Sequence, residues 1–215
     1  MLPKDLKIVV FDTETTGLKD RDQVIQFSCV CLNNEFKVID MHSFYCNVGI
    51  PIPQDAIEVH GISNKKLEEL SEGKFIEDYI PHIPYLANAT NTLFVGYNVA
   101  FDIKKTNYSL ESEGYNPVDF GTKVETFPKR LTGRNFHMDL MGTLSRNFGY
   151  AKNQKLISMF KEHGPCSEKD IEKLLNKLSD KFGVMRNDEQ TYHDALFDTM
   201  ITTSLLIRYK HFYIV

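Results

Sequence analysis

The sequence predicts an α/β fold in which helices flank a mixed β-sheet. Apolar or alternating segments of strand length fill the first part of the chain, and helix-like and strand-like segments alternate after them. The chain has 215 residues, of which 42% are hydrophobic. This length and composition are typical of one globular unit with a full core, so we expect a single domain over residues 1–215.

The opening segments predict a β-meander. Residues 7–13, about 23–32 and about 36–46 are apolar or alternate between apolar and polar side chains. Asn33 and Asn34 separate the second segment from the third and favour a tight turn between them.

Helical and extended segments follow in turn. The stretch PIPQDAIEVHGIS, residues 51–63, is predicted to be irregular at its prolines. Residues 64–70 and 75–88 have the apolar spacing of helices. A short buried strand over 92–98 then leads into a helix over 100–113.

The second half of the chain is predicted to be mainly helical. Residues 115–137 are polar and interrupted by glycine and proline, which indicates a long loop. Asp139 is well placed to cap a helix over 140–148. Further helices are predicted over 168–182, which carries an apolar stripe, and over about 191–210.

The composition restricts the class of function. A net charge of −4 excludes a strongly basic nucleic-acid coat, but it allows an enzyme that holds phosphates through metal ions. The four cysteines contain no Cys-x-x-Cys pair, which argues against a zinc ribbon. Because we find no signal peptide or membrane span, we expect no membrane contact and a cytoplasmic location.

The stretch KIVVFDTETTG, residues 7–17, ends a buried strand in two acids. Strand alternation places Asp12 and Glu14 on one face. Two like charges at the end of a core strand are costly unless a cation or a proton lies between them.

Two further acids have the same character. Asp102 follows the strand over 92–98, and Asp198 lies on the apolar stripe of the last helix. Either acid alone could form a salt bridge or a helix cap. Four inward carboxylates without a nearby cysteine instead favour a hard cation such as Mg²⁺ or Mn²⁺. Two such ions about 4 Å apart would neutralise the cluster. They would also hold the attacking and the leaving oxygen when a phosphodiester bond is broken.

His193 is a candidate general base. It precedes Asp198 by five residues, a spacing that rotates it away from the face of Asp198 on an ideal helix. We therefore expect it at the start of the helix or on the preceding loop, where its imidazole could take a proton from attacking water. The alternative is an exposed surface histidine. Asp194 is interpreted as a charge at the helix N-terminus and not as a ligand.

Three short stretches resemble the motifs of a known family. FDTETTG, NVAFD and HDALFD, in this order, are similar to the three motifs of the DEDDh 3′→5′ exonucleases, and PIPQDAIEVHGIS resembles the stretch between the first two in the proofreading branch. The resemblance spans residues 7 to about 207. It implies a ribonuclease H-like fold and release of nucleoside 5′-monophosphates from the 3′ end of single-stranded or frayed DNA.

The resemblance also implies residue roles. Asp12 would bridge two divalent ions, Glu14 and Asp198 would bind the ion nearer the nucleophile, Asp102 would help to hold the other, and His193 would be the general base. Leu18 would insert between the last two bases, although Leu18 and Phe101 could equally be core residues. The implied substrate contacts are Thr13, Thr15, Thr16, Gly17, Leu18, His60, Gly61, Ile62, Asn98 and Phe101.

Two segments depart from the compact family pattern. Residues 115–137 and 149–170 resemble insertions and carry the basic residues near 129–134 and 152–155. Either segment could shape a DNA channel or bind a partner, for which a polymerase or another replication protein is a candidate.

Other functions stay open. An exoribonuclease would use the same residues, and a contact to the 2′-OH would distinguish it. A nonenzymatic nucleic-acid-binding subunit would be expected to have lost a ligand or the histidine, and all five residues are present. A phosphotransferase with an aspartyl nucleophile would have no role for HDALFD.

Overall fold

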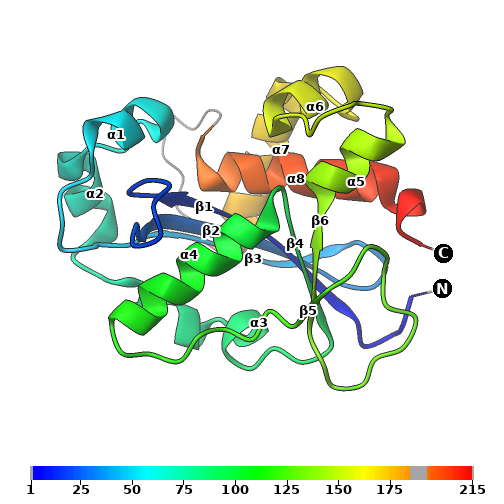
Figure 1. Cartoon of the computed structure of the whole chain (residues 1–215), viewed down its shortest axis with the longest axis horizontal. Helices are drawn as coiled ribbons and strands as arrows, with labels where there is room; N and C mark the ends of the chain where they lie inside the picture. The colour runs from blue at the N-terminus through cyan, green and yellow to red at the C-terminus, as the bar shows by residue number, and fades with distance from the viewer. Residues whose placement is uncertain (1, 185–192, 215) are drawn as a thin grey trace.

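A six-stranded mixed sheet forms the centre of the computed structural model, which describes residues 2–184 and 193–214 (Figure 1). Its order is β3-β2-β1-β4-β6-β5. The strands are β1 Lys7–Thr15, β2 Val24–Leu32, β3 Val38–Tyr45, β4 Thr92–Gly96, β5 Thr122–Lys123 and β6 Phe136–Asp139. The first three form an antiparallel meander, and β4, β6 and β5 run parallel to β1. The predicted α/β fold with an opening meander is confirmed.

Helices lie on both sides of this sheet (Figure 1). The α-helices are α1 Gln54–His60, α2 Asn64–Ser71, α3 Pro84–Ala87, α4 Val99–Ser112, α5 Leu140–Asn147, α6 Leu156–His163, α7 Glu168–Phe182 and α8 Ala195–Tyr209. Three 3₁₀ turns, η1 Ile76–Asp78, η2 Ile80–His82 and η3 Lys210–Phe212, complete the order. None of the helices in the described ranges has the length and apolarity that a membrane crossing requires.

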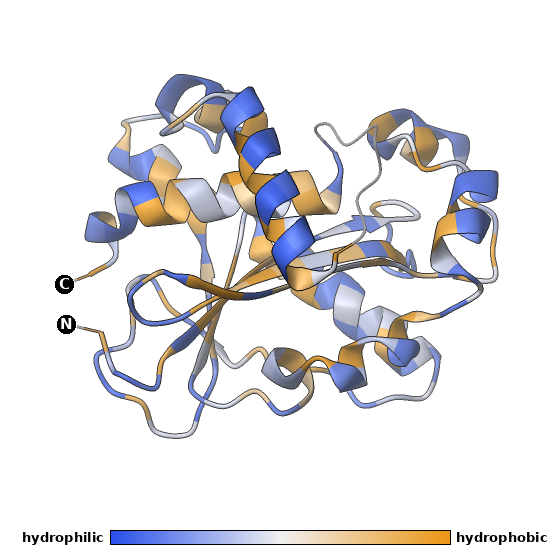
Figure 2. Ribbon diagram, turned by 180° about the vertical axis from the view of Figure 1, so that it is seen from behind, coloured by the Kyte–Doolittle hydropathy of each residue, from blue (hydrophilic) through white to orange (hydrophobic). Residues whose placement is uncertain are grey.

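Strand alternation divides the core between the two faces of the sheet. In β1, Ile8 and Val10 pack on one face of the sheet with residues of α5, α7 and α8. Val9 and Phe11 pack on the other face with residues of α4, η1 and η2. Seen from behind, α7 crosses over α8 and shows hydrophilic residues along its outer side (Figure 2). The face of β1 that leads to Asp12 and Glu14 is therefore the face that α8 covers.

Prolines explain why one predicted helix is wrong. Residues 75–88 form the turns η1 and η2 and the short helix α3 instead of one continuous helix. Pro81 and Pro84 have no N–H to donate, and each interrupts the α-helical hydrogen bonds. The stretch 51–63 is irregular at Pro51 and Pro53, as predicted, but it also contains the unpredicted helix α1, which begins directly after Pro53 and is closed by Gly61.

Long-range pairing accounts for the other differences. The predicted loop over 115–137 contains β5 and the first residues of β6, and both strands are too short to recognise without their parallel partners. Helix α6 lies inside the segment 149–170, where no helix was predicted. The predicted helix over about 191–210 starts later, at Ala195, and residues 191–192 lie outside the described residues.

Gly121, directly before β5, packs closely against the backbone at the start of β6. Its φ is +67°, and a Cβ there would lie 1.7 Å from the carbonyl oxygen of Asn135. We expect Gly121→Ala to lower the free energy of unfolding by about 2–4 kcal/mol, measured in urea, from the left-handed strain and the clash together. Gly133→Ala is the control, because Gly133 has a similar φ of +75° and open space around it. An equal loss in both variants would show that the clash contributes nothing.

Candidate active site

Asp12 and Glu14 lie on the same face near the carboxyl end of β1, as the alternation predicts. Glu14 is only 9% exposed. Burial, followed by the nearby carboxylates of Asp102 and Asp198, raises the pKa of Asp12 well above its usual value. Burial and the charges of Asp198 and Asp194 act in the same way on the pKa of Glu14. These shifts show that the acids share one low-dielectric site.

Helix α4 contributes Asp102 from its first turn. The side chain is 3% exposed, and its Oδ1 accepts hydrogen bonds from the backbone N–H of Thr13 at 3.1 Å and from the Thr13 hydroxyl at 2.7 Å. Burial raises the pKa of Asp102 to about 7, although the Thr13 hydrogen bonds oppose the shift. Thr13 points to the α4 side of β1, so it joins the strand end to this acid.

Asp198 lies in the first turn of helix α8, and His193 lies two residues before the helix begins at Ala195. His193 is exposed and has a left-handed φ of +64°. Ligand atoms of Glu14, His193 and Asp198 all lie within 4.8 Å of one another. The prediction that His193 precedes the helix and approaches the acids is confirmed by this geometry.

The N-terminus of α8 is held by a buried amide that the sequence analysis missed. Asp194 caps the helix, since its Oδ1 accepts from the N–H groups of Leu196 and Phe197. Gln26 of β2 donates from Nε2 to Asp194 Oδ2 at 3.0 Å and accepts from the N–H of Ala195 at 3.1 Å. Gln26 is fully buried and pairs in register with Glu14. A glutamine within an apolar strand was the signal that could have indicated this contact.

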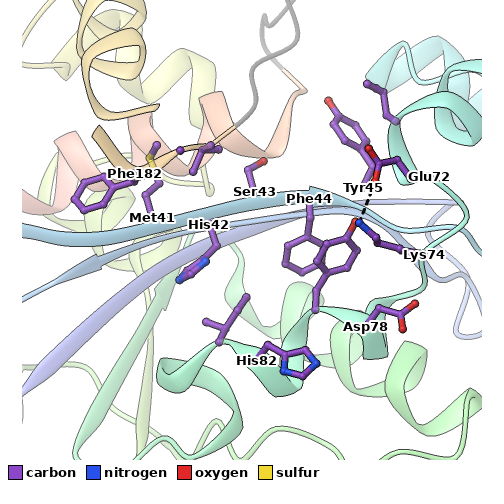
Figure 3. A pocket seen from close by; sticks show the side chains of 15 residues that line it. Met41, His42, Ser43, Phe44, Tyr45, Glu72, Lys74, Asp78, His82 and Phe182 are labelled. Carbon is purple, nitrogen blue, oxygen red and sulfur yellow. Dashed lines mark hydrogen bonds and ion pairs between the residues drawn. The ribbon is translucent and has the colours of Figure 1, made fainter. Parts of the chain in front are cut away.

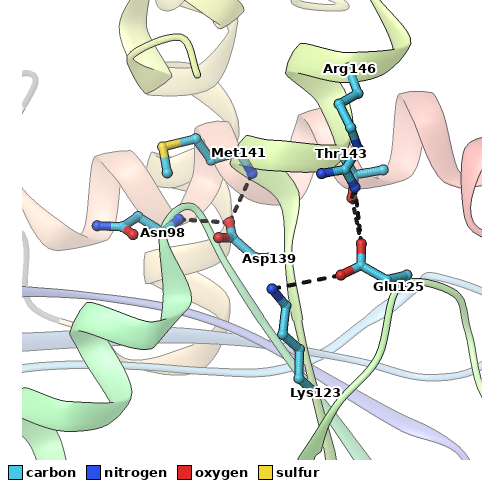
Figure 4. Close-up of polar contacts among 7 residues, drawn as sticks. All are labelled: Asn98, Lys123, Glu125, Asp139, Met141, Thr143 and Arg146. Carbon is cyan, nitrogen blue, oxygen red and sulfur yellow. Dashed lines mark hydrogen bonds and ion pairs between the residues drawn. The ribbon is translucent and has the colours of Figure 1, made fainter. Parts of the chain in front are cut away.

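Asp139 has a second positioning role that was not predicted. Its Oδ1 caps α5 through the N–H of Met141 at 2.9 Å and also accepts from the N–H of Asn98 at 3.0 Å (Figure 4). Asn98 has a left-handed φ of +72° and is the N-cap residue directly before α4. Asp139 therefore fixes the turn from which Asp102 projects.

A separate set of ion pairs lies beside this contact. Glu125 is paired with Lys123 and with Arg146 and takes no part in the contact of Asp139 (Figure 4).

The donor set fits a divalent cation of the Mg²⁺ or Mn²⁺ type. Within the described residues, Asp198 Oδ1 is buried without a hydrogen-bond partner, a costly arrangement unless something binds there. Burial raises the pKa of Asp198 to about 7, so its negative charge also lacks full compensation from the protein. Carboxylate oxygens are the ligands that hard cations prefer.

His60 lies near His193 but is poorly suited to accept a proton. Its Nδ1 accepts a hydrogen bond from the N–H of Ile62 at 3.0 Å, and burial lowers its pKa to about 4. The ring is therefore neutral at physiological pH and has its acceptor nitrogen occupied. Gly61 closes α1 with a left-handed φ of +70°, and Ile62 packs its side chain into the core with Ile25 and Ala56.

The loop after β1 carries the remaining candidate contacts. Leu18 is 85% exposed, so it is not a core residue, whereas Phe101 is half-buried. The hydroxyl of Thr15 donates to the carbonyl of Gly17 at 2.8 Å, and the hydroxyl of Thr16 accepts from the N–H of Gln23 at 3.0 Å. Both threonine hydroxyls thus maintain the loop itself.

The two basic segments lie at opposite ends of the sheet. Gly133 and Asn135 bind Asn91 and Thr92 at the beginning of β4, so residues 129–134 are remote from the acids. Gln154 instead accepts a hydrogen bond from the hydroxyl of Tyr97 at 2.7 Å, at the end of β4 where Asn98 begins the α4 turn. Of the two segments, only residues 152–155 are placed near the site.

A separate pocket of about 420 Å³ lies on the edge strand β3 (Figure 3). Phe44 and Tyr79 stack in it with ring centroids 4.2 Å apart, and Lys74 pairs with Glu72 at 2.9 Å. None of its lining residues is a predicted site residue. The pocket therefore belongs to the sheet edge and not to the acidic site.

Comparison with known proteins decides the family. A family model described as exonuclease, RNase_T, matches residues 9–206. The chain belongs to this exonuclease family. Its order of acids and histidine is that of the DEDDh type, as the three motifs indicated.

Relatives of this exonuclease chain are distant. It is 25% identical over 206 residues to the PolC-type DNA polymerase III of Staphylococcus epidermidis, covering 95% of the chain but only 11% of that protein. Exonuclease I of E. coli, solved with a dT13 oligonucleotide, matches with a TM-score of 0.62 and 21% identity over 96% of this chain and 41% of the other. Exonuclease X, solved with 5′-overhanging duplex DNA, matches with a TM-score of 0.55 and 21% identity over 94% and 89% of the two chains. These structures confirm the ribonuclease H-like fold.

Removing one charge from the acidic site should stabilise the metal-free exonuclease chain. We expect Asp198→Asn to raise the free energy of unfolding by at least about 1 kcal/mol at pH 8 in chelator. A folded pKa of about 7 means that the wild-type protein loses stability as the pH rises from about 4 through 7. The gain should therefore shrink toward pH 5, where the carboxyl group is protonated.

The exposed Asp180 on α7 supplies the control for this measurement. Asp180→Asn should change the unfolding free energy little at either pH, because its carboxylate stays hydrated. A destabilised Asp198→Asn protein at pH 8 would contradict charge repulsion in the site.

Proposed function

We propose that this chain is a metal-dependent 3′→5′ exonuclease that hydrolyses phosphodiester bonds at the 3′ end of single-stranded or frayed DNA and releases nucleoside 5′-monophosphates. One observation carries the proposal: Glu14, His193 and Asp198 place ligand atoms within 4.8 Å of one another, beside Asp12 and Asp102. Membership of the exonuclease family supports it.

The carboxylates are the proposed ligands of two divalent ions, Mg²⁺ or Mn²⁺. Asp12 would contribute to both sites, Glu14 and Asp198 to the one nearer the nucleophile, and Asp102 to the other. When bound, such ions would activate water and stabilise the charge that develops on the phosphate oxygens. Thr13 would hold Asp102 in the orientation that this requires, through its two hydrogen bonds to Oδ1.

His193 is the proposed general base. Its ring reaches Glu14 and Asp198, and its exposure would allow it to return the accepted proton to solvent after each turnover. Gln26 and Asp194 would fix the segment from which it projects. His60 would not compete for the proton, because its pKa is about 4.

The loop residues would hold the terminal nucleotide. Leu18 would separate the last two bases, and Asn98 and Phe101 would border the scissile phosphate from the start of α4. Thr15, Thr16 and Gly17 would shape the loop, while His60, Gly61 and the backbone of Ile62 would lie on the far side of the nucleotide. The DNA complexes of exonucleases I and X support DNA as the substrate, and the PolC-type relative supports a polymerase as a partner.

Matched 5′-labelled DNA and RNA oligonucleotides test the activity. In Mg²⁺ or Mn²⁺ we expect a ladder that shortens from the 3′ end, faster on DNA, and no cleavage in EDTA. Asp12→Ala should abolish the ladder in a protein that still folds, because the cations lose a shared ligand. Faster cleavage of RNA would assign an exoribonuclease. Absence of cleavage on both polymers would contradict the proposal.

His193→Ala tests the general base. We expect kcat to fall by about 10²–10⁴-fold while the protein keeps its thermal stability. His82→Ala is the control, since His82 is exposed in η2 and lines only the pocket at the sheet edge. A wild-type kcat in His193→Ala would assign the proton transfer to another group.

A further inference from the structure

The loop between β1 and β2 presents an apolar side chain to solvent in a well-defined conformation. Leu18 at its tip is the most exposed large hydrophobic residue among those described. The N–H of Thr16 donates to the carbonyl of Gln23 at 2.9 Å, and the Asp22 carboxylate accepts from the N–H of Lys19 at 2.6 Å. These contacts close the loop beneath Leu18.

Gly17 allows this closure. Its φ is +152°, and a Cβ there would lie 2.6 Å from Asp22 Oδ2. A larger residue would push Asp22 away from the N–H of Lys19, and the loop would open. Leu18 is therefore exposed because the hydrogen-bonded loop projects it into solvent.

One face of helix α4 forms hydrogen bonds to the same loop. Ser109 accepts a hydrogen bond from the N–H of Val24 at 2.9 Å, and Ser112 accepts one from the Gln23 side chain at 2.9 Å. Lys105 lies on this face one turn before Ser109. These three residues bind the part of the loop that follows Leu18.

Lys105 is the unusual member of this face. It is 1% exposed, its ammonium donates to the carbonyl oxygen of Lys19, and its Nζ lies 5.2 Å from the centre of the Phe101 ring. The carboxylates of Asp22 and Asp20 favour its positive charge. Burying an ammonium is costly. The Lys19 carbonyl, the Phe101 ring and the two carboxylates offset this cost at Lys105.

The neighbouring lysine provides a natural comparison. Lys104 also reaches the loop, through an ion pair with Asp20 at 2.6 Å, but side chains on both sides of the pair are exposed to solvent. Exposed ion pairs of this kind contribute little to stability. Adjacent lysines on one helix thus contact the same loop, one from within the protein and the other from solvent.

We infer that Lys105 is a positioning residue that holds the carbonyl of Lys19 through its buried ammonium, so that Leu18 is already projected when the 3′ end of a strand arrives. The inference rests on the proposed function. A preformed loop would avoid the ordering cost on binding, so that the apolar side chain could insert between the last two bases at once. The substrate class that fits is a 3′ end whose terminal base can be unstacked.

Steady-state kinetics on single-stranded DNA test the inference. We expect Lys105→Met to raise KM about tenfold and to leave kcat within about twofold, because the loop is less ordered while the acids are unchanged. Lys104→Met should match the wild-type protein. Lys105→Arg, which keeps a charged donor, should recover most of the affinity. Lys105→Gln replaces Lys105→Met if the latter does not fold in thermal denaturation.

A double-mutant cycle separates positioning from general structure. In a Leu18→Ala background, Lys105→Met should raise KM little further, because both changes remove the same interaction with the bases. Binding of an oligonucleotide with 2-aminopurine at its 3′ end, measured in Ca²⁺, should show terminal unstacking with the wild type and not with Lys105→Met.

The outcomes distinguish the inference from the proposed function. Additive effects in the cycle, equal losses in Lys104→Met and Lys105→Met, or normal unstacking by Lys105→Met would overturn the role of Lys105. A wild-type protein without nuclease activity would instead overturn the proposed function on which the inference rests.

Discussion

Repulsion among buried carboxylates is the constraint on which the rest of the site depends. Asp12, Glu14, Asp102 and Asp198 converge from β1, α4 and α8, and burial raises the pKa of each. Such a cluster opposes folding unless the surrounding structure is strong enough to hold it. The apolar rows of β1 on both faces of the sheet provide that support.

Hydrogen bonds from uncharged groups decide where the acids lie. Thr13 binds Asp102, Gln26 binds Asp194 at the start of α8, and the N–H of Asn98 binds Asp139. Each contact joins a strand end to a helix start, so that the two elements cannot shift independently. Lys105 makes a comparable link through a charged donor, because its ammonium joins α4 to the loop that carries Leu18. Rigid placement of this kind is what a site with closely spaced ligands needs.

Local patterns predicted most elements correctly. The meander, the helices α4 and α7 and the cap at Asp139 depend on alternation, periodicity and capping residues that lie within a few positions of one another. The failures have a physical cause as well. Strand β6 exists because it pairs with β4, and β5 exists because it pairs with β6. Helix α3 is short because Pro81 and Pro84 interrupt the segment despite its helical apolar spacing.

The sequence by itself determined which acids and which histidine belong together, because strand and helix periods place Asp12, Glu14 and Asp198 on inward faces and the three motifs occur in order. Only the tertiary structure decided how they are held. Gln26 is adjacent to Asp194 in space although 168 residues separate them in the chain. Lys105 is buried, while Lys104 beside it is exposed, because successive residues on a helix point in directions about 100° apart, so one lysine reaches the loop from within the protein and the other from solvent.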